Sequence, residues 1–173
     1  MFEQVFCAGQ EDWQPRPVDE RLVEPAAELL AQNAEYFSRI GQPLPGPRDV
    51  VEDLAALPPG MTAESKSYLL VYHKGRPAAV LDFVTGYPRP SCGFIGLFVL
   101  AKPLHRQGLG AQLLHLLEQA ARGCGLDSLR LGCYAANLPG AAFWKKQGFA
   151  VVEERTLQET SGEHLLLVME KSI

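Results

Sequence analysis

The sequence lacks the features that mark several large classes of protein. No apolar run approaches the roughly 20 residues that a helix needs to cross a bilayer. The first residues do not combine a basic segment with an apolar core, so no secretory signal is expected. Only four cysteines occur, and they show no paired spacing. We therefore expect a cytoplasmic protein with reduced, mostly packing cysteines, which are Cys7, Cys92, Cys124 and Cys133.

Basic stripes and metal-binding patterns are also missing. Sixteen Lys and Arg residues stand against 20 Asp and Glu residues, which gives a formal net charge of −4. This balance argues against nucleic acid as a partner, although it allows a cationic substrate. The four histidines do not have the spacing of a zinc site, so no metal is expected. The length of 173 residues suits a single domain over residues 1–173.

Hydrophobic periodicity divides the chain into short helices and strands. Pro15 and Pro17 are expected to break regular structure, and Gly75 suits a hairpin turn that needs a positive φ angle. Hairpins followed by a strand–helix–strand–helix order predict a mixed α/β sheet. The expected elements are a short strand or loose arm over residues 1–10, helices over 19–41 and 49–56, strands over 68–72, 78–85, 94–100 and 128–134, and a final hairpin of strands over 151–157 and 165–170.

The most informative stretch joins an apolar strand, residues 94–100, to a loop with two glycines. The loop reads His105-Arg106-Gln107-Gly108-Leu109-Gly110-Ala111, and apolar residues at helical spacing follow it. Glycine lets the backbone approach a ligand closely. The free N–H groups at the start of a helix, together with the positive end of its dipole, form a site for an anion such as a pyrophosphate.

Other protein families that join a strand to a helix through a glycine loop have motifs that fit this sequence less well. A dinucleotide fold needs a third glycine where this chain has Leu113, and an acidic residue some twenty positions later, which is absent. The Gly-Lys-Ser/Thr end of a nucleotide P-loop is absent as well. A nicotinamide-dependent oxidoreductase is therefore a distant alternative.

A second motif follows the predicted strand over residues 128–134. It runs from Asn137 to Phe149 and includes Ala141, Phe143 and Gly148. With the glycine loop, it resembles the two signature segments of the GNAT family of N-acetyltransferases, Gln/Arg-x-x-Gly-x-Gly/Ala and Asn-x-x-Ala-x-x-Phe-Tyr-x-x-x-Gly-Phe. The resemblance is specific over residues 68–149.

Three positions depart from the family pattern. His105 stands at the first position of the loop, Gly140 replaces an alanine, and Trp144 replaces a tyrosine. The family tyrosine often reprotonates the leaving thiolate. Because an indole N–H does not give up its proton at neutral pH, that role is vacant here or has moved to another residue.

The resemblance implies both a fold and an activity. The fold would be an α/β (α+β) GNAT fold, with a central mixed, mostly antiparallel twisted sheet of about six to seven strands and helices on both faces. The strand before the glycine loop would splay from the strand over residues 128–134. The activity would be direct transfer of acetyl from acetyl-CoA to a primary amine in a ternary complex, without a metal.

The resemblance also implies which residues hold the cofactor. Backbone groups of the strand would bind the pantetheine arm, and amides of the loop would bind the pyrophosphate, with His105 as an extra donor. Asn137 is either a contact of the cofactor arm or a helix N-cap, and Phe143 belongs to the core or to the wall of the groove. The cofactor-binding candidates are Phe98, Val99, Leu100, His105, Arg106, Gln107, Gly108, Leu109, Gly110, Ala111, Asn137, Phe143 and Trp144.

Candidates for catalysis and for binding the acceptor rest on single residues. Asp82 interrupts an apolar strand, and it is either a general base or a solvent-facing or locally bonded aspartate. Tyr134 is either the acid that replaces the family tyrosine or a packed aromatic, and solvent could also supply that proton. Cys133 leaves a covalent acetyl-enzyme as a faint alternative. Asn33, Tyr36 and Tyr87 are candidate acceptor contacts, or packing and capping residues.

The sequence leaves the acceptor and the assembly open. The acidic balance and a proline-rimmed entry favour a small molecule over a protein. The loss of the tyrosine at Trp144 motivates an alternative function, a non-catalytic acyl-CoA-binding or sensor domain on the same fold. Members of the family often pair through their C-terminal strands, so a homodimer is a possible assembly.

Overall fold

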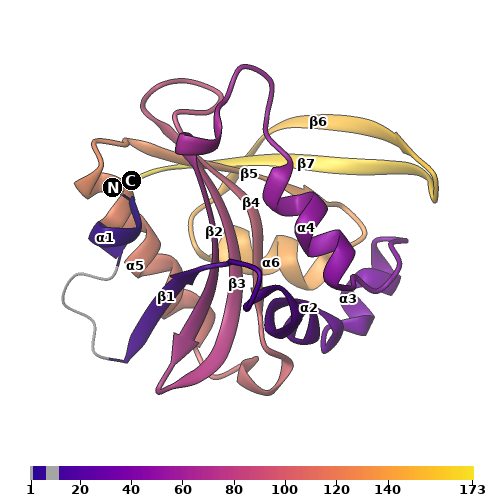
Figure 1. The fold of residues 1–173 in the computed structure, drawn as a ribbon. Coiled ribbons are helices and arrows are strands. Elements are labelled where there is room, and N and C mark those ends of the chain that lie inside the picture. The colour runs from indigo at the N-terminus through magenta and orange to yellow at the C-terminus, as the bar shows by residue number, and fades with distance from the viewer. Residues whose placement is uncertain (1, 7–11) are drawn as a thin grey trace.

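A seven-stranded sheet forms the centre of the computed structural model, which describes residues 2–6 and 12–173 (Figure 1). Cys7, expected to pack in its reduced form, lies outside the described residues. The spatial order of the strands is β1-β2-β3-β4-β5-β7-β6. Their bounds are β1 Trp13–Pro17, β2 Lys66–His73, β3 Arg76–Thr85, β4 Cys92–Leu100, β5 Ser128–Tyr134, β6 Ala150–Glu159 and β7 Gly162–Ser172.

The pairing of the strands is antiparallel except between β4 and β5, which run parallel. The predicted mixed, mostly antiparallel sheet is confirmed. Lys74 and Gly75, with φ angles of 51° and 76°, form the tight turn between β2 and β3, as expected for a two-residue hairpin loop.

Helices cover both faces of the sheet, and two apolar cores result. The helices α1 Phe2–Phe6, α5 Leu109–Gly123 and α6 Leu138–Lys146 bury one face, called here the α5 face. The helices α2 Val23–Ala31, α3 Ala34–Arg39 and α4 Pro47–Ala55 cover the opposite face over β2, β3 and β4, called here the α4 face (Figure 1).

Three expectations for the N-terminal part were wrong. Residues 2–6 form a helix rather than a strand or a loose arm, because Phe2 and Phe6 pack into the core of the α5 face. Pro15 and Pro17 lie within β1, where they are tolerated because β1 is an edge strand. The helix expected over residues 19–41 is two helices, which meet at Asn33.

Asn33 breaks the helix because its side chain is bound elsewhere. Its amide nitrogen Nδ2 donates to the carbonyl oxygen of Leu29 at 3.3 Å and to that of Leu100, at the end of β4, at 3.0 Å. The side chain is buried. It therefore ties the junction of α2 and α3 to the strand that precedes the glycine loop.

The strands β4 and β5 pair over only part of their length. Cys92 to Ile95 lie beside Ser128 to Leu131, and the pairing ends there. At the same level the register of β3 with β4 shifts after Asp82, so that β4 carries an extra residue, Gly96. The remainder of β4 therefore diverges from β5, as the resemblance implied. The gap between the two diverging strands is called the split below.

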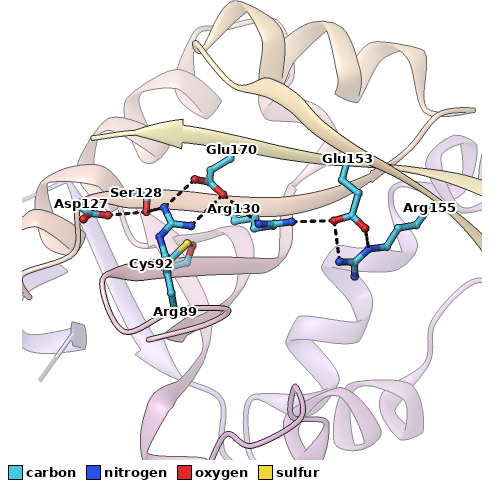
Figure 2. A network of polar contacts seen from close by, with 9 residues as sticks. Arg89, Cys92, Asp127, Ser128, Arg130, Glu153, Arg155 and Glu170 are labelled. Carbon is cyan, nitrogen blue, oxygen red and sulfur yellow. Dashed lines mark hydrogen bonds and ion pairs between the residues drawn. The ribbon is translucent and has the colours of Figure 1, made fainter.

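An ion-pair network stabilises the sheet on the side where β4 and β5 remain paired (Figure 2). Glu170 of β7 lies between Arg89 and Arg130, at 2.8 and 3.3 Å. Glu153 of β6 lies between Arg130, at 3.1 Å, and Arg155. The chain of charges thus links the loop before β4 to β5, β7 and β6, and it fixes the strands from which the split opens.

Candidate functional site

The glycine loop presents a row of free backbone donors. The amide N–H groups of residues 106 to 110 donate to no acceptor within the part of the chain that the structure describes, whereas those of Ala111 and Gln112 bond to the carbonyl of Gly108. The loop leads directly into α5, a helix of 15 residues. Free N–H groups at the positive end of a helix dipole are suited to binding an anion.

The shape of the loop depends on left-handed backbone at two positions. Arg106 has a φ angle of 62° and Gly108 one of 79°. A Cβ atom at Gly108 would meet no heavy atom within 4 Å, so that side of the loop is open. At Gly110, by contrast, a Cβ atom would lie 3.4 Å from the ring of Phe143. The first glycine opens the loop to a ligand, and the second lets α6 pack against α5.

Two side chains of the loop form hydrogen bonds with backbone carbonyls that precede the loop. Nε2 of His105 lies 3.1 Å from the carbonyl oxygen of Leu100, and Nε2 of Gln107 donates to the carbonyl of Pro103 at 2.6 Å. These bonds hold the ends of the loop together. The extra donor expected from His105 is therefore engaged with β4, and the backbone amides are the free donors.

The free edge of β4 faces the split. The N–H of Ala101 donates to the carbonyl of Ala78 on β3 at 2.8 Å. Because successive residues of a strand point their backbone groups to alternate sides, those of Leu100 and Phe98 face the opposite edge. The carbonyl of Leu100 indeed accepts from Asn33 and His105, which approach from that side. The N–H groups of Phe98 and Leu100 are left for a ligand in the split.

Asn137 and Trp144 both have structural roles in α6. Oδ1 of Asn137 accepts the N–H of Gly140 at 3.3 Å, so Asn137 is the N-cap of α6. A Cβ atom at position 140 would lie 2.1 Å from Nδ2 of Asn137, so an alanine here would force the Asn137 side chain to move. The indole of Trp144 is buried and packs against Phe98, Phe143 and Phe149. Any effect of Trp144 on a cofactor passes through these rings.

Asp82 lies under the extra residue of β4. A Cβ atom at Gly96 would lie 2.5 Å from Oδ2 of Asp82, so only glycine leaves room for this carboxylate, and Gly96 itself is exposed. Nζ of Lys66 lies 3.2 Å from the same oxygen. The alternative of a locally bonded aspartate therefore holds in part. The carboxylate therefore lies beside the point where the pairing of β4 with β5 ends.

Burial makes Asp82 a weaker acid than an ordinary aspartate. Desolvation raises the pKa of its carboxyl to about 6, although Lys66 opposes the shift. Oδ1 has no hydrogen-bond partner among the described residues, and neither has the buried hydroxyl of Tyr68, the residue opposite Asp82 on β2. A carboxylate with a pKa near neutrality and a free acceptor atom suits a general base.

Lys66 is a buried cation with three acceptors. Its side chain is only 6% exposed, and Nζ donates to the carbonyls of Asp53 and Ala56 at 2.6 Å each, in addition to Asp82. The two carbonyls end α4, so Lys66 caps the helix and fixes it over the α4 face. A pocket of about 150 Å³ lies beside it, between α4 and Tyr68.

Tyr134 lies at the end of β5, on the other side of the split. Its hydroxyl donates to Oε1 of Glu159 at 2.7 Å, and burial together with this bond raises the pKa of the phenol. Glu159 also accepts a hydrogen bond from Nε2 of Gln42. The tip of the β6–β7 hairpin is thereby joined to the loop between α3 and α4.

The three acceptor candidates have different environments. Asn33 is buried and both hydrogens of its amide are used, so it positions β4 rather than donating to an acceptor. Tyr36 is half-buried, and burial raises its pKa to about 12. Its ring packs edge-on against Phe37 at 4.9 Å between centroids. Tyr87 lies farther along the sheet, with its ring against Phe94.

Sequence reasoning missed three residues of the site: Lys66, Gly96 and Glu159. A glycine within the run 94–100 was a signal for Gly96, whereas Lys66 lies before the strand expected over residues 68–72 and gave no signal of its burial. Glu159 gave no signal, because its partners come from remote segments.

In the described residues no group of three or more His, Cys, Asp or Glu side chains is arranged to hold a metal ion, and no helix is long and apolar enough to cross a membrane.

Comparison with known proteins gives one family match. The model of the Acetyltransferase (GNAT) family matches residues 26–149, which include the glycine loop and the segment around Asn137. No curated protein matched the sequence.

Solved structures give a consistent result. An acetyltransferase from Thermus thermophilus has 25% sequence identity and a TM-score of 0.73, with 94% of this chain and 97% of that chain covered. An acetyl transferase from Salmonella typhimurium that modifies the N-terminal serine of a ribosomal protein has 18% identity, a TM-score of 0.73, and 95% and 96% coverage. A ribosomal alpha-N-protein acetyltransferase in complex with coenzyme A has 16% identity, a TM-score of 0.72, and 95% and 96% coverage. The last two show the fold.

Proposed function

The chain belongs to the GNAT acetyltransferase family, and on that premise we propose that it transfers the acetyl group of acetyl-CoA to a primary amine of a small molecule. The observation that carries the proposal is the row of free amides at residues 106 to 110, beside the open edge of β4. We propose further that one catalytic domain, residues 1–173, acts in the cytoplasm, where acetyl-CoA is made and thiols stay reduced.

The residues present fit coenzyme A. The free amides of the loop suit the pyrophosphate, and the open side of Gly108 gives it room. The N–H groups of Phe98 and Leu100 suit the polar pantetheine arm, and the arm would lie in the split beside the ring of Phe143. Bound acetyl-CoA supplies an acyl thioester, which an amine attacks without a metal.

Asp82 is the proposed general base. It lies at the level of Gly96, where β4 diverges, and its pKa of about 6 leaves it ionised at pH 7. It accepts the proton that the acceptor ammonium must lose before nitrogen attacks the carbonyl carbon. Lys66 keeps the carboxylate in place and prevents its pKa from rising further.

The proton for the departing sulfur comes either from Tyr134 or from water. Tyr134 keeps its phenol proton at neutral pH and stands at the end of the split. Tyr134→Phe distinguishes the two sources, because loss of a required acid lowers kcat about 100-fold, whereas a water donor leaves it nearly unchanged.

A covalent acetyl-cysteine is disfavoured. Cys133 is buried, and burial raises the pKa of its thiol to about 11, so little thiolate exists at pH 7. Direct attack by the amine requires no such intermediate, and Cys133→Ala should leave single-turnover acetyl transfer in place.

The alternative function is an acyl-CoA sensor without catalysis, favoured by Trp144 at the position of the family tyrosine. Release of free thiol from acetyl-CoA in the presence of a panel of amines separates the two functions. If the protein is a catalyst, it releases thiol with at least one amine, and its Asp82→Asn variant does so more slowly. A sensor binds acetyl-CoA and CoA and releases thiol with none of the amines.

We also propose that β6 pairs two copies of the chain. This ten-residue strand forms one edge of the sheet, and Val151 and Val152 on it are 39% and 52% exposed. Unpaired edges with exposed apolar residues favour association with a second strand.

A further inference from the structure

Glu159 is a carboxylate beside the split whose charge no cation balances. Its two hydrogen-bond donors, the hydroxyl of Tyr134 and the amide of Gln42, are both neutral. Within residues 2–6 and 12–173 no lysine, arginine or histidine forms an ion pair with it. His164, on the same hairpin, bonds instead to the hydroxyl of Ser161.

The other carboxylates on this face of the sheet are balanced. Asp82 pairs with Lys66. Glu153 and Glu170 each lie between two arginines (Figure 2). Glu159 is partly buried, and a partly buried charge without a counter-charge is unfavourable until a cation reaches it.

The phenol of Tyr134 contacts this carboxylate, and a second aromatic ring packs on Tyr134. The ring of His164 lies edge-on against Tyr134 at 5.7 Å between centroids. A carboxylate beside aromatic rings favours an organic ammonium group over a metal ion. The described residues thus provide an anionic position beside two aromatic rings at the end of the split.

We propose that Glu159, with Tyr134, binds a second positive charge of the acceptor, so that the acceptor is a diamine or an amine with another cationic group. The proposal rests on the proposed function, which places the reacting amine near Asp82 and Gly96. One ammonium group of the acceptor would be acetylated, and the other would be held by Glu159.

The topology sets a lower limit on the separation of the two positions. Ile95, next to Gly96, pairs with Leu131, and Tyr134 lies three residues beyond Leu131. Three residues of extended strand span about 10 Å. A chain of at least seven carbon atoms between the two nitrogens is needed to match such a span.

The hairpin tip limits how large the acceptor can be. Glu159 bonds to Gln42, and the ring of His164 lies where it would touch a Cβ atom at Gly41, at 2.9 Å. The hairpin and the loop between α3 and α4 therefore meet beyond Tyr134. This contact closes that end of the split, which favours a small acceptor over a polypeptide.

The test compares 1,7-diaminoheptane with 1-aminoheptane as acceptors at saturating acetyl-CoA. The parent is expected to prefer the diamine, and Glu159→Gln should lower the ratio of the two kcat/KM values about tenfold, which corresponds to about 1.4 kcal/mol. A change in Tyr134 caused by the substitution would affect both amines and cancel in the ratio. Glu154→Gln, on the exposed face of the same strand, is the control of equal charge and should leave the ratio unchanged.

Two results would overturn the inference: equal use of both amines by the parent, or an unchanged ratio in Glu159→Gln. If neither amine is acetylated, calorimetric titration of 1,7-diaminoheptane into the protein with CoA decides the matter separately. Binding that Glu159→Gln loses and Glu154→Gln keeps would support the cation site while the proposed reaction fails. The absence of binding would refute the site.

Discussion

At the scale of single residues, the proposed reaction depends on Asp82 and on Gly96, the glycine beside it. Gly96 has no side chain, and its absence gives the carboxylate of Asp82 a place at the surface of β4. The ion pair with Lys66 holds this carboxylate, while burial keeps its pKa close to neutrality. Substitutions at these positions therefore change catalysis more than they change cofactor binding.

Gly96→Ala is expected to displace the base. The new Cβ atom would meet Oδ2 of Asp82 at 2.5 Å, so kcat should fall tenfold or more, roughly in line with loss of a positioned base, while acetyl-CoA still binds. Overpacking would also cost about 1–3 kcal/mol of stability. Gly46→Ala serves as a control, because its Cβ atom would meet nothing closer than 3.8 Å. A parent-like kcat in Gly96→Ala would remove Asp82 from the reaction.

The pH dependence of kcat reports on the same carboxyl. Only the ionised form of Asp82 accepts a proton, and its pKa is raised to about 6. At saturating acceptor, kcat should therefore fall about tenfold per unit of pH below that value and level off above it. Asp82→Asn should lower the plateau about 100-fold and lack the break. A break that persists in Asp82→Asn would assign it to another group.

The role of a single residue was predictable where its type was unusual among its neighbours in the sequence. Asp82 stood out as a charge in an apolar strand, and Asn137 as a capping residue before a helix. Glu159 did not stand out, because a glutamate near a hairpin tip is ordinary. Its importance arises from Tyr134 and Gln42, which folding brings from positions 25 and 117 residues away.

At the scale of elements, the site depends on how α4 and the glycine loop are fixed to the sheet. Lys66 connects the last carbonyls of α4 to Asp82 on β3. His105 and Asn33 both bind the carbonyl of Leu100, one from the loop and one from the junction of α2 and α3. The helices on the α4 face are thus attached to the strands that border the split.

Lys66→Met tests the connection to α4. Removing a buried cation with three acceptors should cost about 3 kcal/mol in denaturant unfolding, since Asp82 and two carbonyls lose their partner. The pKa of Asp82 should rise further, so the break in kcat should move above pH 6. Lys74→Met removes an exposed lysine whose ion pair spans 4.0 Å, and it should change stability by less than about 0.5 kcal/mol. Equal losses in the two variants would contradict this role.

The elements were predictable where local chemistry decides them. The glycine turn between β2 and β3 and the loop into α5 follow from residues within each segment. The break at Asn33 was missed because its cause, the carbonyl of Leu100, lies 67 residues away. The proline-containing strand β1 was missed because its place at the edge of the sheet is a property of the whole fold.

At the scale of the whole molecule, the sheet has two different halves. Helices cover β2, β3 and β4 on both faces, whereas β6 ends the other half with most of its residues exposed. The ion-pair network of Figure 2 stiffens this second half below the split. A second copy of the chain could pair with β6 without covering the glycine loop on α5.

Sedimentation velocity over a range of protein concentrations tests this pairing. The parent is expected to sediment at twice the chain mass of 19.0 kDa, and Val152→Lys should shift it to the monomer, because a charge at the exposed edge opposes association. Leu44→Lys, at a position that is 53% exposed outside β6, should leave the dimer in place. A parent that is monomeric at every concentration would refute the pairing.

The most direct test of the central claim is a calorimetric titration of acetyl-CoA into the parent, Gly108→Glu and Gly60→Glu. Both glycines have a φ angle of 79° and open space at the Cβ position, so the two substitutions bring equal strain and equal charge. Only the first places a carboxylate among the free amides of residues 106 to 110. The account predicts micromolar binding in the parent and in Gly60→Glu, and a loss of about 100-fold or more in Gly108→Glu. Equal affinities in the three proteins, or a folded parent that does not bind, would contradict it.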